Sequence, residues 1–374
     1  MNVPCRPRPR ALGVFALGAS LLLATTGCAK SASTPSANGG SAAPQSSAGA
    51  QQLETPTPAA SGAAPAAAGC TLAASGTPTG LQLKNLVVGF SQSEPEANPF
   101  RIAETASIRA EAAKIGVKKL LVTNAQATLS KQISDIQDMI AQGAQALIVA
   151  PFNSTGLEPA LAAATAKHIP VVAIDRKLTG ATPCKDYLTF IGSNFVQQGQ
   201  RAAAQMITAT GGKGKVVILL GTSGNNVTTD RTAGFLAGIK GTPGLQVVAQ
   251  QTGNFKRQDG QTVTEQFLQS HPDLTAVYAE NDEMALGAVV ALRDAGKTPG
   301  KTVKIVSVDG TRNAVQQIVN GSINAVIESN PRFGPLAFST LQSFLSGTAI
   351  SPALIISDKQ YDASNAKSAV ASAY

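Results

Sequence analysis

Short apolar runs alternate with segments of helical periodicity from about residue 84 to residue 357, and this alternation constrains the fold more than any other feature. The intervening helices are amphipathic, as in residues 129–140, where leucine and isoleucine recur at helical spacing. The runs that we predict as strands are residues 86–90, 120–123, 146–150, 170–174, 187–194, 216–220, 245–249, 276–279, 303–308, 325–328 and 354–356. Apolar strands joined by such helices predict parallel sheets covered on both faces.

The alternation runs through two similar series, and the rhythm changes near residues 187–194. The fold class we predict is therefore α/β, with two doubly wound parallel-sheet lobes joined by a three-strand hinge. The first lobe is expected at residues 84–192 and 329–356, and the second at 193–328 and 357–374. Hinge crossings are expected near residues 192–194, 329–330 and 356–358. Ligands of such folds bind at the carboxyl ends of strands from both lobes.

The first 28 residues have the layout of a targeting segment. Basic residues extend through Arg10, an apolar run covers residues 11–24, and small residues lead to Cys28. The run is too short to span a bilayer comfortably. The layout resembles a bacterial lipoprotein signal, in which Cys28 carries the lipid, and the alternative is an ordinary secretory signal cut nearby. We expect an exported protein, lipid-anchored to the outer face of the cytoplasmic membrane.

Residues 29–83 are rich in Ala, Ser, Pro, Gly and Thr, with one acidic residue, Glu54. Because such a segment buries too little apolar area to offset its ordering entropy, we predict a disordered tether. Of the four cysteines, Cys5 leaves with the signal and Cys28 is used for lipid. Cys70 and Cys184 can then pair in an oxidising compartment, or stay as two unpaired thiols.

Polar and aromatic side chains stand at or just beyond nearly every strand end. Asp, Asn and Arg can bond neighbouring sugar hydroxyls in fixed geometry, while aromatic rings cover the apolar face of a sugar. Any one of these residues could instead cap a helix or form a surface ion pair, and Asp309 before Gly310 could form a turn. The recurrence favours a sugar site. Its candidate ligand-binding residues are Ser91, Gln92, Phe100, Arg101, Asp175, Arg176, Arg231, Phe255, Asn281, Asp309 and Glu328.

Several motifs resemble a known family. Residues 281–288 (NDEMALGA), Asp175-Arg176, Arg231-x-x-Gly234-Phe235 and residues 308–310 (VDG) look like the ribose-type periplasmic sugar-binding proteins of ABC importers. The resemblance covers about residues 84–357. More specific motifs are similar to the galactofuranose-binding branch of that family: residues 88–92 (VGFSQ), Arg101-x-x-Glu104-Thr105, Ala150-Pro151 with residues 155–159, and residues 253–257 (GNFKR).

The resemblance implies a type I periplasmic binding protein fold and a substrate-binding lipoprotein of an ABC sugar importer. It implies that Asp175 and Arg176 bind ring hydroxyls from one lobe, and that Arg231, Phe255, Asn281 and Asp309 bind them from the other. Glu328 matches a position that is Glu in the galactofuranose-like branch. The expected ligand is a pentose or hexose in furanose form, such as galactofuranose or arabinofuranose. Phe100 stands where that branch typically has Trp, and the loop of residues 93–99 looks longer.

The sequence offers little for catalysis. Its two histidines, His168 and His271, lie before a strand and in a turn, without metal-ligand spacing. Paired carboxylates suggest a glycosidase-like enzyme as an alternative, but interleaved arginines hold carboxylates ionised and disfavour a general acid. A sugar-responsive regulator of the same fold would need a helix-turn-helix where this chain has its signal and tether. We therefore expect no enzyme activity, cofactor or metal.

The expected partners are a monosaccharide and a membrane permease of the ABC type. The formal net charge is +8, but the Lys and Arg residues are scattered, so we expect no nucleic-acid partner. We expect a monomer.

Overall fold

The structure, a computed structural model, describes residues 51–54 and 69–374. The predicted signal of residues 1–28, its lipidation site Cys28 and most of the predicted tether lie outside the described residues. Among the helices that are described, none combines the length and apolar character needed to cross a membrane.

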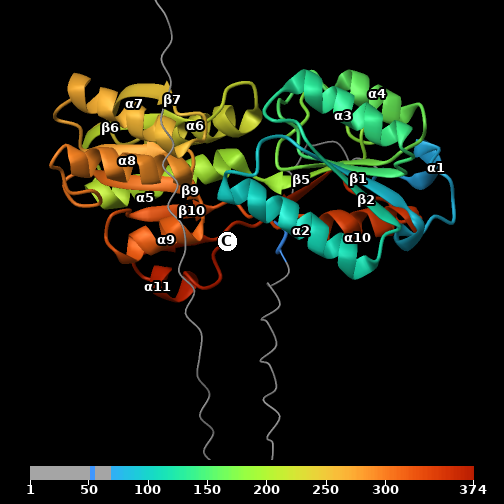
Figure 1. Cartoon of the computed structure of the whole chain (residues 1–374). Coiled ribbons are helices and arrows are strands. Elements are labelled where there is room, and N and C mark those ends of the chain that lie inside the picture. Colours follow the sequence, from blue (N-terminus) through green and yellow to red (C-terminus); the bar gives the residue numbers. More distant parts are fainter. Residues whose placement is uncertain (1–50, 55–68) are drawn as a thin grey trace, which may run out of the picture. The chain divides into compact units, whose positions relative to one another are not determined.

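The first lobe is built on a parallel six-stranded sheet in the order β11-β5-β4-β3-β1-β2 (Figure 1). Helices α2 and α10 pack together on one face, and α3 and α4 on the other. The strands are β1 (Val87–Gln92), β2 (Lys119–Asn124), β3 (Ala146–Val149), β4 (Val171–Ile174), β5 (Thr189–Ser193) and β11 (Ala353–Ile356). The helices are α1 (Leu72–Ser75), the 3-10 turn η1 (Leu83–Asn85), α2 (Pro99–Ile115), α3 (Leu129–Ala141), α4 (Glu158–Thr165) and α10 (Gly334–Leu345).

The second lobe repeats this plan with a sheet in the order β12-β10-β9-β8-β6-β7. The strands are β6 (Gly214–Leu220), β7 (Leu245–Thr252), β8 (Ala276–Ala279), β9 (Lys304–Asp309), β10 (Ala325–Glu328) and β12 (Gln360–Asp362). The helices are α5 (Phe195–Thr210), α6 (Asn226–Ile239), α7 (Arg257–Ser270), α8 (Asp282–Asp294), α9 (Arg312–Val319) and α11 (Ala366–Ala369). The two parallel-sheet lobes confirm the predicted fold class. The edge strand β12, which the sequence did not predict, pairs antiparallel with β10.

Alternate residues of one strand serve the two faces of the second sheet. Val216 and Ile218 pack with residues of α5 and α6, whereas Val217 and Leu219 pack with residues of α7, α8 and α9. Because both faces are covered, these strands are continuous apolar runs in the sequence.

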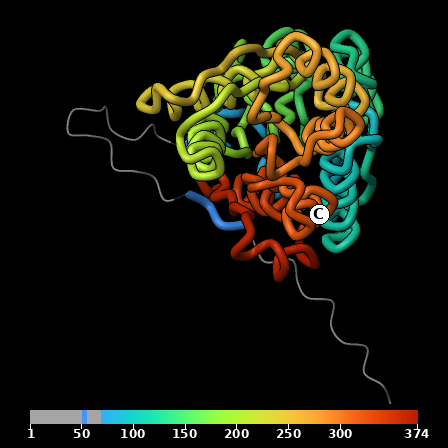
Figure 2. Tube along the Cα trace, turned by 90° about the vertical axis from the view of Figure 1, so that its left-hand side faces the viewer, coloured from blue at the N-terminus to red at the C-terminus, as the bar shows by residue number. Residues whose placement is uncertain are grey.

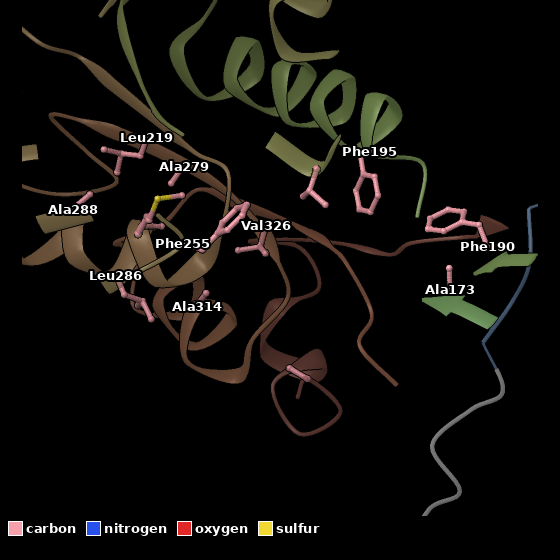
Figure 3. Close-up of a cluster of buried hydrophobic side chains, with 14 of the residues drawn as sticks. Ala173, Phe190, Phe195, Leu219, Phe255, Ala279, Leu286, Ala288, Ala314 and Val326 are labelled. Atoms are coloured by element: carbon pink, nitrogen blue, oxygen red, sulfur yellow. The ribbon is translucent and has the colours of Figure 1, made fainter. Parts of the chain in front are cut away.

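The chain crosses between the lobes three times, after Ser193, between β10 and α10, and between β11 and β12. Gln198 joins the crossings, because its amide nitrogen donates to the Glu328 carbonyl at 3.2 Å and to the Asp358 carboxylate at 2.7 Å. The hydroxyl of Ser193 also donates to Asp358, at 3.2 Å. Figure 3 shows Phe190 and Phe195, which flank the first crossing and belong to one buried hydrophobic cluster containing residues of both lobes. The crossings are thus packed and hydrogen-bonded.

Two stretches of the predicted tether contact the first lobe. The Glu54 amide donates to Ile355 at 2.7 Å, and the Ser357 amide donates to Gln52 at 2.8 Å. These bonds pair with backbone groups at the otherwise unpaired edge of β11, and they explain why this stretch is held against the first lobe. Further along, Cys70 and Cys184 form a disulfide with their Cα atoms 4.8 Å apart. Residues 69–83 therefore contain the short helix α1 and a covalent link instead of unstructured chain.

Several element boundaries differ from the sequence prediction. The sequence pattern predicts a helix over residues 231–239, but helix α6 begins at Asn226 because the Asn225 side chain accepts a hydrogen bond from the Thr228 amide and caps the helix. The weak helix formers of its first turn hid this start in the sequence. The pattern likewise predicts a helix over residues 261–269, whereas helix α7 begins at Arg257. Helix α11 follows β12 within residues 357–374, which were predicted as the end of the second lobe and a tail without a helix.

Candidate functional site

A small cavity of about 30 Å³ lies between the carboxyl ends of the two sheets. Its lining comes from both lobes: Glu94, Asn98, Phe100, Arg101, Asp175 and Arg176 from the first, and Val227, Arg231, Phe255, Asn281 and Asp309 from the second. Most of the residues predicted from strand ends therefore meet at one place. Ser91, Gln92 and Glu328 do not line this cavity.

Ser91 and Gln92 are buried at the end of β1 and bond to neighbouring helices. The Ser91 hydroxyl accepts from the Gln132 amide at 3.2 Å, and the Gln92 amide donates to Glu104 at 2.8 Å. Glu328 at the end of β10 is likewise used within the protein, accepting from the Tyr361 hydroxyl at 2.8 Å and the Lys359 amide at 3.0 Å. In this structure these side chains support the hinge and the first-lobe helices.

The sequence prediction missed Glu94, Asn98 and Val227. Glu94 and Asn98 lie in the loop of residues 93–98, where an acidic residue and an amide before Pro99 are the signals that could have identified them. Asn98 caps α2 through the Phe100 amide at 2.9 Å and donates across the cavity to the Phe255 carbonyl at 3.4 Å. Val227 offers no polar signal, and its place follows from the early start of α6.

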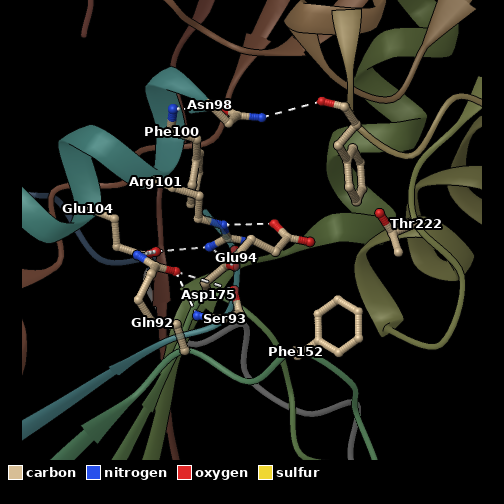
Figure 4. A network of polar contacts seen from close by, with 12 residues as sticks. Gln92, Ser93, Glu94, Asn98, Phe100, Arg101, Glu104, Phe152, Asp175 and Thr222 are labelled. Atoms are coloured by element: carbon tan, nitrogen blue, oxygen red, sulfur yellow. Dashed lines mark hydrogen bonds and ion pairs between the residues drawn. The ribbon is translucent and has the colours of Figure 1, made fainter. Parts of the chain in front are cut away.

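The first-lobe wall, which we define as Glu94, Arg101, Glu104, Asp175 and Arg176, is a network of largely buried ion pairs. Figure 4 shows Glu94, Arg101, Glu104 and Asp175 of this wall. Arg101 contacts Asp175 at 2.7 Å, Glu104 at 2.9 Å and Glu94 at 3.0 Å. The other oxygen of Glu94 accepts from Arg176 at 3.0 Å. A single carboxylate thus bridges both arginines, and both arginines line the cavity.

The second-lobe wall, which we define as Arg231, Glu280, Asn281, Asp282 and Asp309, is held mainly by neutral hydrogen bonds. Arg231 lies 3.6 Å from Asp309 and donates to the Gln198 amide oxygen at 2.9 Å. Asn281 caps α8 through the Met284 amide at 3.0 Å and donates to the Phe255 carbonyl at 3.1 Å. Asn281 is therefore both a helix cap and a lining residue.

The carboxylates of Glu280 and Asp282 lie behind Asn281. Glu280 accepts from the Gly221 amide at 2.8 Å and from the Thr232 hydroxyl. Asp282 accepts from the Ser307 hydroxyl, the Gly310 amide at 2.9 Å and the Thr311 amide at 2.7 Å. Burial raises the pKa of Glu280 to about 7 and that of Asp282 to about 6, although these bonds oppose the shift.

In the first-lobe wall, nearby guanidinium groups as well as burial determine the pKa of Glu94 and that of Glu104. The two guanidinium groups lower the pKa of Glu94 to about 2 and so outweigh its burial, the largest single effect, which raises it. Burial raises the pKa of Glu104 to about 7, because Arg101 is shared among three carboxylates and one Glu104 oxygen is buried without a partner among the described residues. The Glu94 carboxylate, which lines the cavity, is therefore charged at neutral pH.

Strained backbone supports the idea that the cavity is a functional site. The lining residues Asp175, Phe255 and Asp309 have φ of 66°, 59° and 134°. Such angles are uncommon for residues other than glycine and persist where surrounding contacts enforce them.

Two glycines permit close approaches at the second-lobe side. A Cβ atom on Gly221 would lie 1.9 Å from the Phe255 ring, so only glycine lets this ring reach the cavity. A Cβ atom on Gly199 would lie 2.2 Å from the Arg231 carbonyl, so this glycine lets α5 and α6 pack closely and sets the position of Arg231.

No group of His, Cys, Asp and Glu residues suited to a metal ion occurs within residues 51–54 and 69–374. The lining groups can donate and accept hydrogen bonds in fixed directions, with two aromatic rings between them. This arrangement fits recognition of a small polyhydroxylated molecule.

Comparisons with known proteins identify relatives over most of the chain. A family model described as a periplasmic binding protein domain matches residues 88–349. The chain is 34% identical over 266 residues to the galactofuranose-binding protein YtfQ of Escherichia coli, which covers 69% of this chain and 82% of that protein. It is 36% identical over 270 residues to the ribose import binding protein RbsB of Bacillus subtilis, covering 71% and 84%.

A solved structure of the binding component of the arabinose ABC transporter from Shewanella sp. ANA-3, bound to α- and β-L-arabinofuranose, is also similar. It superimposes with a TM-score of 0.73 at 35% identity, covering 76% of this chain and 94% of that chain. The relatives are binding proteins, in agreement with the expectation that this chain has no enzyme activity. The chain belongs to the periplasmic binding protein domain family, and it is an extracytoplasmic solute-binding protein rather than an enzyme.

Proposed function

We propose that this protein is the substrate-binding component of an ABC sugar importer and that it binds a pentose or hexose in furanose form. Galactofuranose and arabinofuranose are the leading candidates, because two of the relatives described above bind these sugars. The observation that carries the proposal is the convergence of three buried arginines, two aspartates and two phenylalanines on one cavity between the lobes. These residues are Arg101, Arg176, Arg231, Asp175, Asp309, Phe100 and Phe255.

The chemistry of the lining suits a sugar ring. Each hydroxyl both donates and accepts, so guanidinium and carboxylate groups can bond neighbouring hydroxyls together, each bond contributing about 1.5 to 3 kcal/mol. Phe100 and Phe255 belong to opposite lobes and offer apolar surface to the C–H groups of the ring. No group in this set needs to transfer a proton for binding.

The lobes must separate to admit the ligand, because bonds between them close over the cavity. The backbone N–H of Asn226 in the second lobe donates to the Ser154 hydroxyl at 2.9 Å, and its side-chain Oδ1 accepts from the Lys177 backbone amide at 2.9 Å. Asn98 adds its bond to Phe255. A sugar that contacts both walls therefore favours the closed state, and closure about the three crossings couples binding to a change in shape.

Export and anchoring complete the proposal. We infer that Cys28 carries the lipid and that the segment after it tethers the binding lobes near a permease in the cytoplasmic membrane. Treatment of producing cells with radiolabelled palmitate, comparing the wild type with Cys28→Ala, tests the anchor. Equal label in both proteins would contradict lipidation at Cys28.

A thermal-shift screen of the purified protein with D-galactose, L-arabinose, D-ribose and D-glucose tests the binding function. A sugar at about 100 times its dissociation constant stabilises the folded state by about 2.7 kcal/mol, which gives a clear rise in Tm. Calorimetry then measures affinity, and recovery of unchanged sugar excludes turnover. Absence of a shift with every pentose and hexose tested would overturn the proposal.

A further inference from the structure

An aromatic cluster behind the cavity joins three segments that are distant in the sequence. Phe100 of α2 lines the cavity, and its ring centroid lies 6.4 Å from that of Phe333 in the second crossing. The ring of Tyr374, which follows α11, packs edge-on against Phe100 at 6.1 Å. Figures 1 and 2 show this end of the chain beside α2. Tyr374 is therefore in direct contact with a residue of the candidate site.

The backbone that carries Tyr374 is held by the second lobe. The Arg312 amide at the start of α9 donates to the Tyr374 carbonyl at 2.6 Å, and its guanidinium donates to the Ala373 carbonyl at 3.4 Å. Arg332 donates to Ser372 at 3.3 Å and lies 5.9 Å from the centre of the Tyr374 ring. Because its backbone belongs to one lobe and its ring contacts the other, Tyr374 bridges the lobes at the cavity.

The hydroxyl of Tyr374 is buried and has no hydrogen-bond partner among the described residues. Burial raises the pKa of Tyr374 well above its usual value, with the nearby carboxylates of Asp309 and Asp282 adding to the effect, so this hydroxyl remains a donor. A buried donor without a partner costs free energy, and a ligand that accepts a hydrogen bond from it can recover this cost.

We propose that Tyr374 binds the ligand and stabilises the closed state of this site. This proposal rests on the proposed sugar-binding function. Its hydroxyl donates to the bound sugar, directly or through one ordered water. Its ring holds Phe100 over the sugar and forms this contact only when the lobes are closed. The end of the chain thus contributes to affinity, although neither the strand-end pattern nor the cavity lining includes it.

The hydroxyl is tested with Tyr374→Phe and a matched control, Tyr278→Phe. The Tyr278 hydroxyl is also buried without a partner among residues 51–54 and 69–374, but its ring stacks on Phe235 at 4.1 Å inside the second lobe. Calorimetry with the sugar that gives the largest thermal shift should show a dissociation constant raised about 3- to 10-fold in Tyr374→Phe and unchanged in Tyr278→Phe. Equal affinities in Tyr374→Phe and the wild type would overturn the role of the hydroxyl.

The ring is tested with Tyr374→Leu, which keeps the backbone anchors. Removal of the contact with Phe100 should raise the dissociation rate by at least about 10-fold in stopped-flow measurements, while the Tm without sugar stays close to that of the wild type. A Tm that falls without sugar, with a dissociation rate unchanged, would show a purely structural role and overturn the inference. If the wild type binds no sugar, the proposed function is wrong. If the wild type binds a sugar and the Tyr374 variants bind and release it as the wild type does, only this inference is wrong.

Discussion

Both walls of the cavity are largely buried, but they differ in the groups that neutralise their carboxylates. In the first-lobe wall Arg101 and Arg176 contact carboxylates at 2.7 to 3.0 Å, forming a continuous ion-pair network. In the second-lobe wall a single guanidinium, that of Arg231, approaches one carboxylate at 3.6 Å. Hydroxyl and amide donors satisfy the carboxylates of Glu280 and Asp282 instead.

This contrast explains why Glu94 and Glu280 have opposite pKa shifts, whereas Glu104 shifts upward like Glu280 because Arg101 is shared among three carboxylates. Two nearby guanidinium groups outweigh desolvation at Glu94 and lower its pKa to about 2, whereas hydrogen bonds do not outweigh desolvation at Glu280, whose pKa rises to about 7. Neutral donors stabilise a charge less than an ion pair at short range. The folded state of the first-lobe wall should therefore tolerate the loss of one contact, whereas that of the second-lobe wall should depend on Arg231.

The largest effect is expected for Arg231→Met. Burial raises the pKa of Asp309 against the opposing effect of Arg231, and this change also leaves the Gln198 amide oxygen and the Glu280 carbonyl without their donor, which costs about 1–3 kcal/mol of stability. The dissociation constant for the sugar should rise at least about 100-fold. Calorimetry and urea unfolding measure both effects. As a control, Arg293→Met removes an arginine of the same lobe that bonds Ser322 outside the cavity, and a similar loss there would contradict a specific role for Arg231.

The next effect is expected at Asp175. Asp175→Ala removes the 2.7 Å contact with Arg101 and places alanine at a φ of 66°, so the sugar should bind about 100-fold more weakly. Asp175→Asn should cost about 10-fold, because asparagine tolerates this backbone angle and keeps one acceptor. Arg101 stays paired with Glu94 and Glu104 in both variants. Equal affinities for Ala and Asn variants would show that neither the remaining acceptor nor the strain matters.

A smaller effect is expected from pH. The folded-state pKa of Glu280 is about 7, against an ordinary value of 4.5, so the folded protein binds more protons between these values. The resulting stabilisation is fully present below about pH 4.5 and is lost as pH rises through 7, about 2 kcal/mol between pH 5 and 8. Glu94 contributes no change in this window, because its pKa is about 2.

Urea unfolding at pH 5 and pH 8 tests this difference with Glu280→Gln. The glutamine keeps a side-chain acceptor for the Gly221 amide but does not titrate. The wild type should lose more stability than this variant as pH rises, and Glu94→Gln should leave the pH 5 to 8 slope at its wild-type value. A steeper loss in Glu280→Gln than in the wild type would contradict the assignment.

The smallest effect is expected at Asn98, which connects the two walls. Asn98→Ser keeps a side-chain oxygen that can cap α2 but loses the donor to the Phe255 carbonyl, so affinity should fall less than about 5-fold with stability unchanged. Asn98→Ala also loses the cap and should lower the free energy of unfolding by about 1 kcal/mol. Equal stability of the two variants would exclude the capping role.

Much of the fold could be predicted from the sequence, because the hydrophobic periodicity of each strand and helix is carried by its own residues. Each run such as residues 216–220 is continuously apolar since helices cover both sheet faces, and this predicted the parallel lobes. The boundaries were less accurate where weak helix formers begin an element, as at Asn226. Strand ends also predicted lining residues such as Asp175 and Asp309, because parallel strands end at one edge of a sheet.

Tertiary structure alone decided which polar strand-end residues face the cavity. Glu328 stands at a strand end like Asp309, yet its carboxylate bonds Tyr361 of the antiparallel edge strand β12, which local periodicity did not predict. Glu94 enters the site because its loop reaches Arg176, 82 positions away in the sequence. Tyr374 lies against Phe100 because two distant arginines hold its backbone. Such contacts depend on how the two lobes and the end of the chain pack together, and no local pattern of residues encodes that packing.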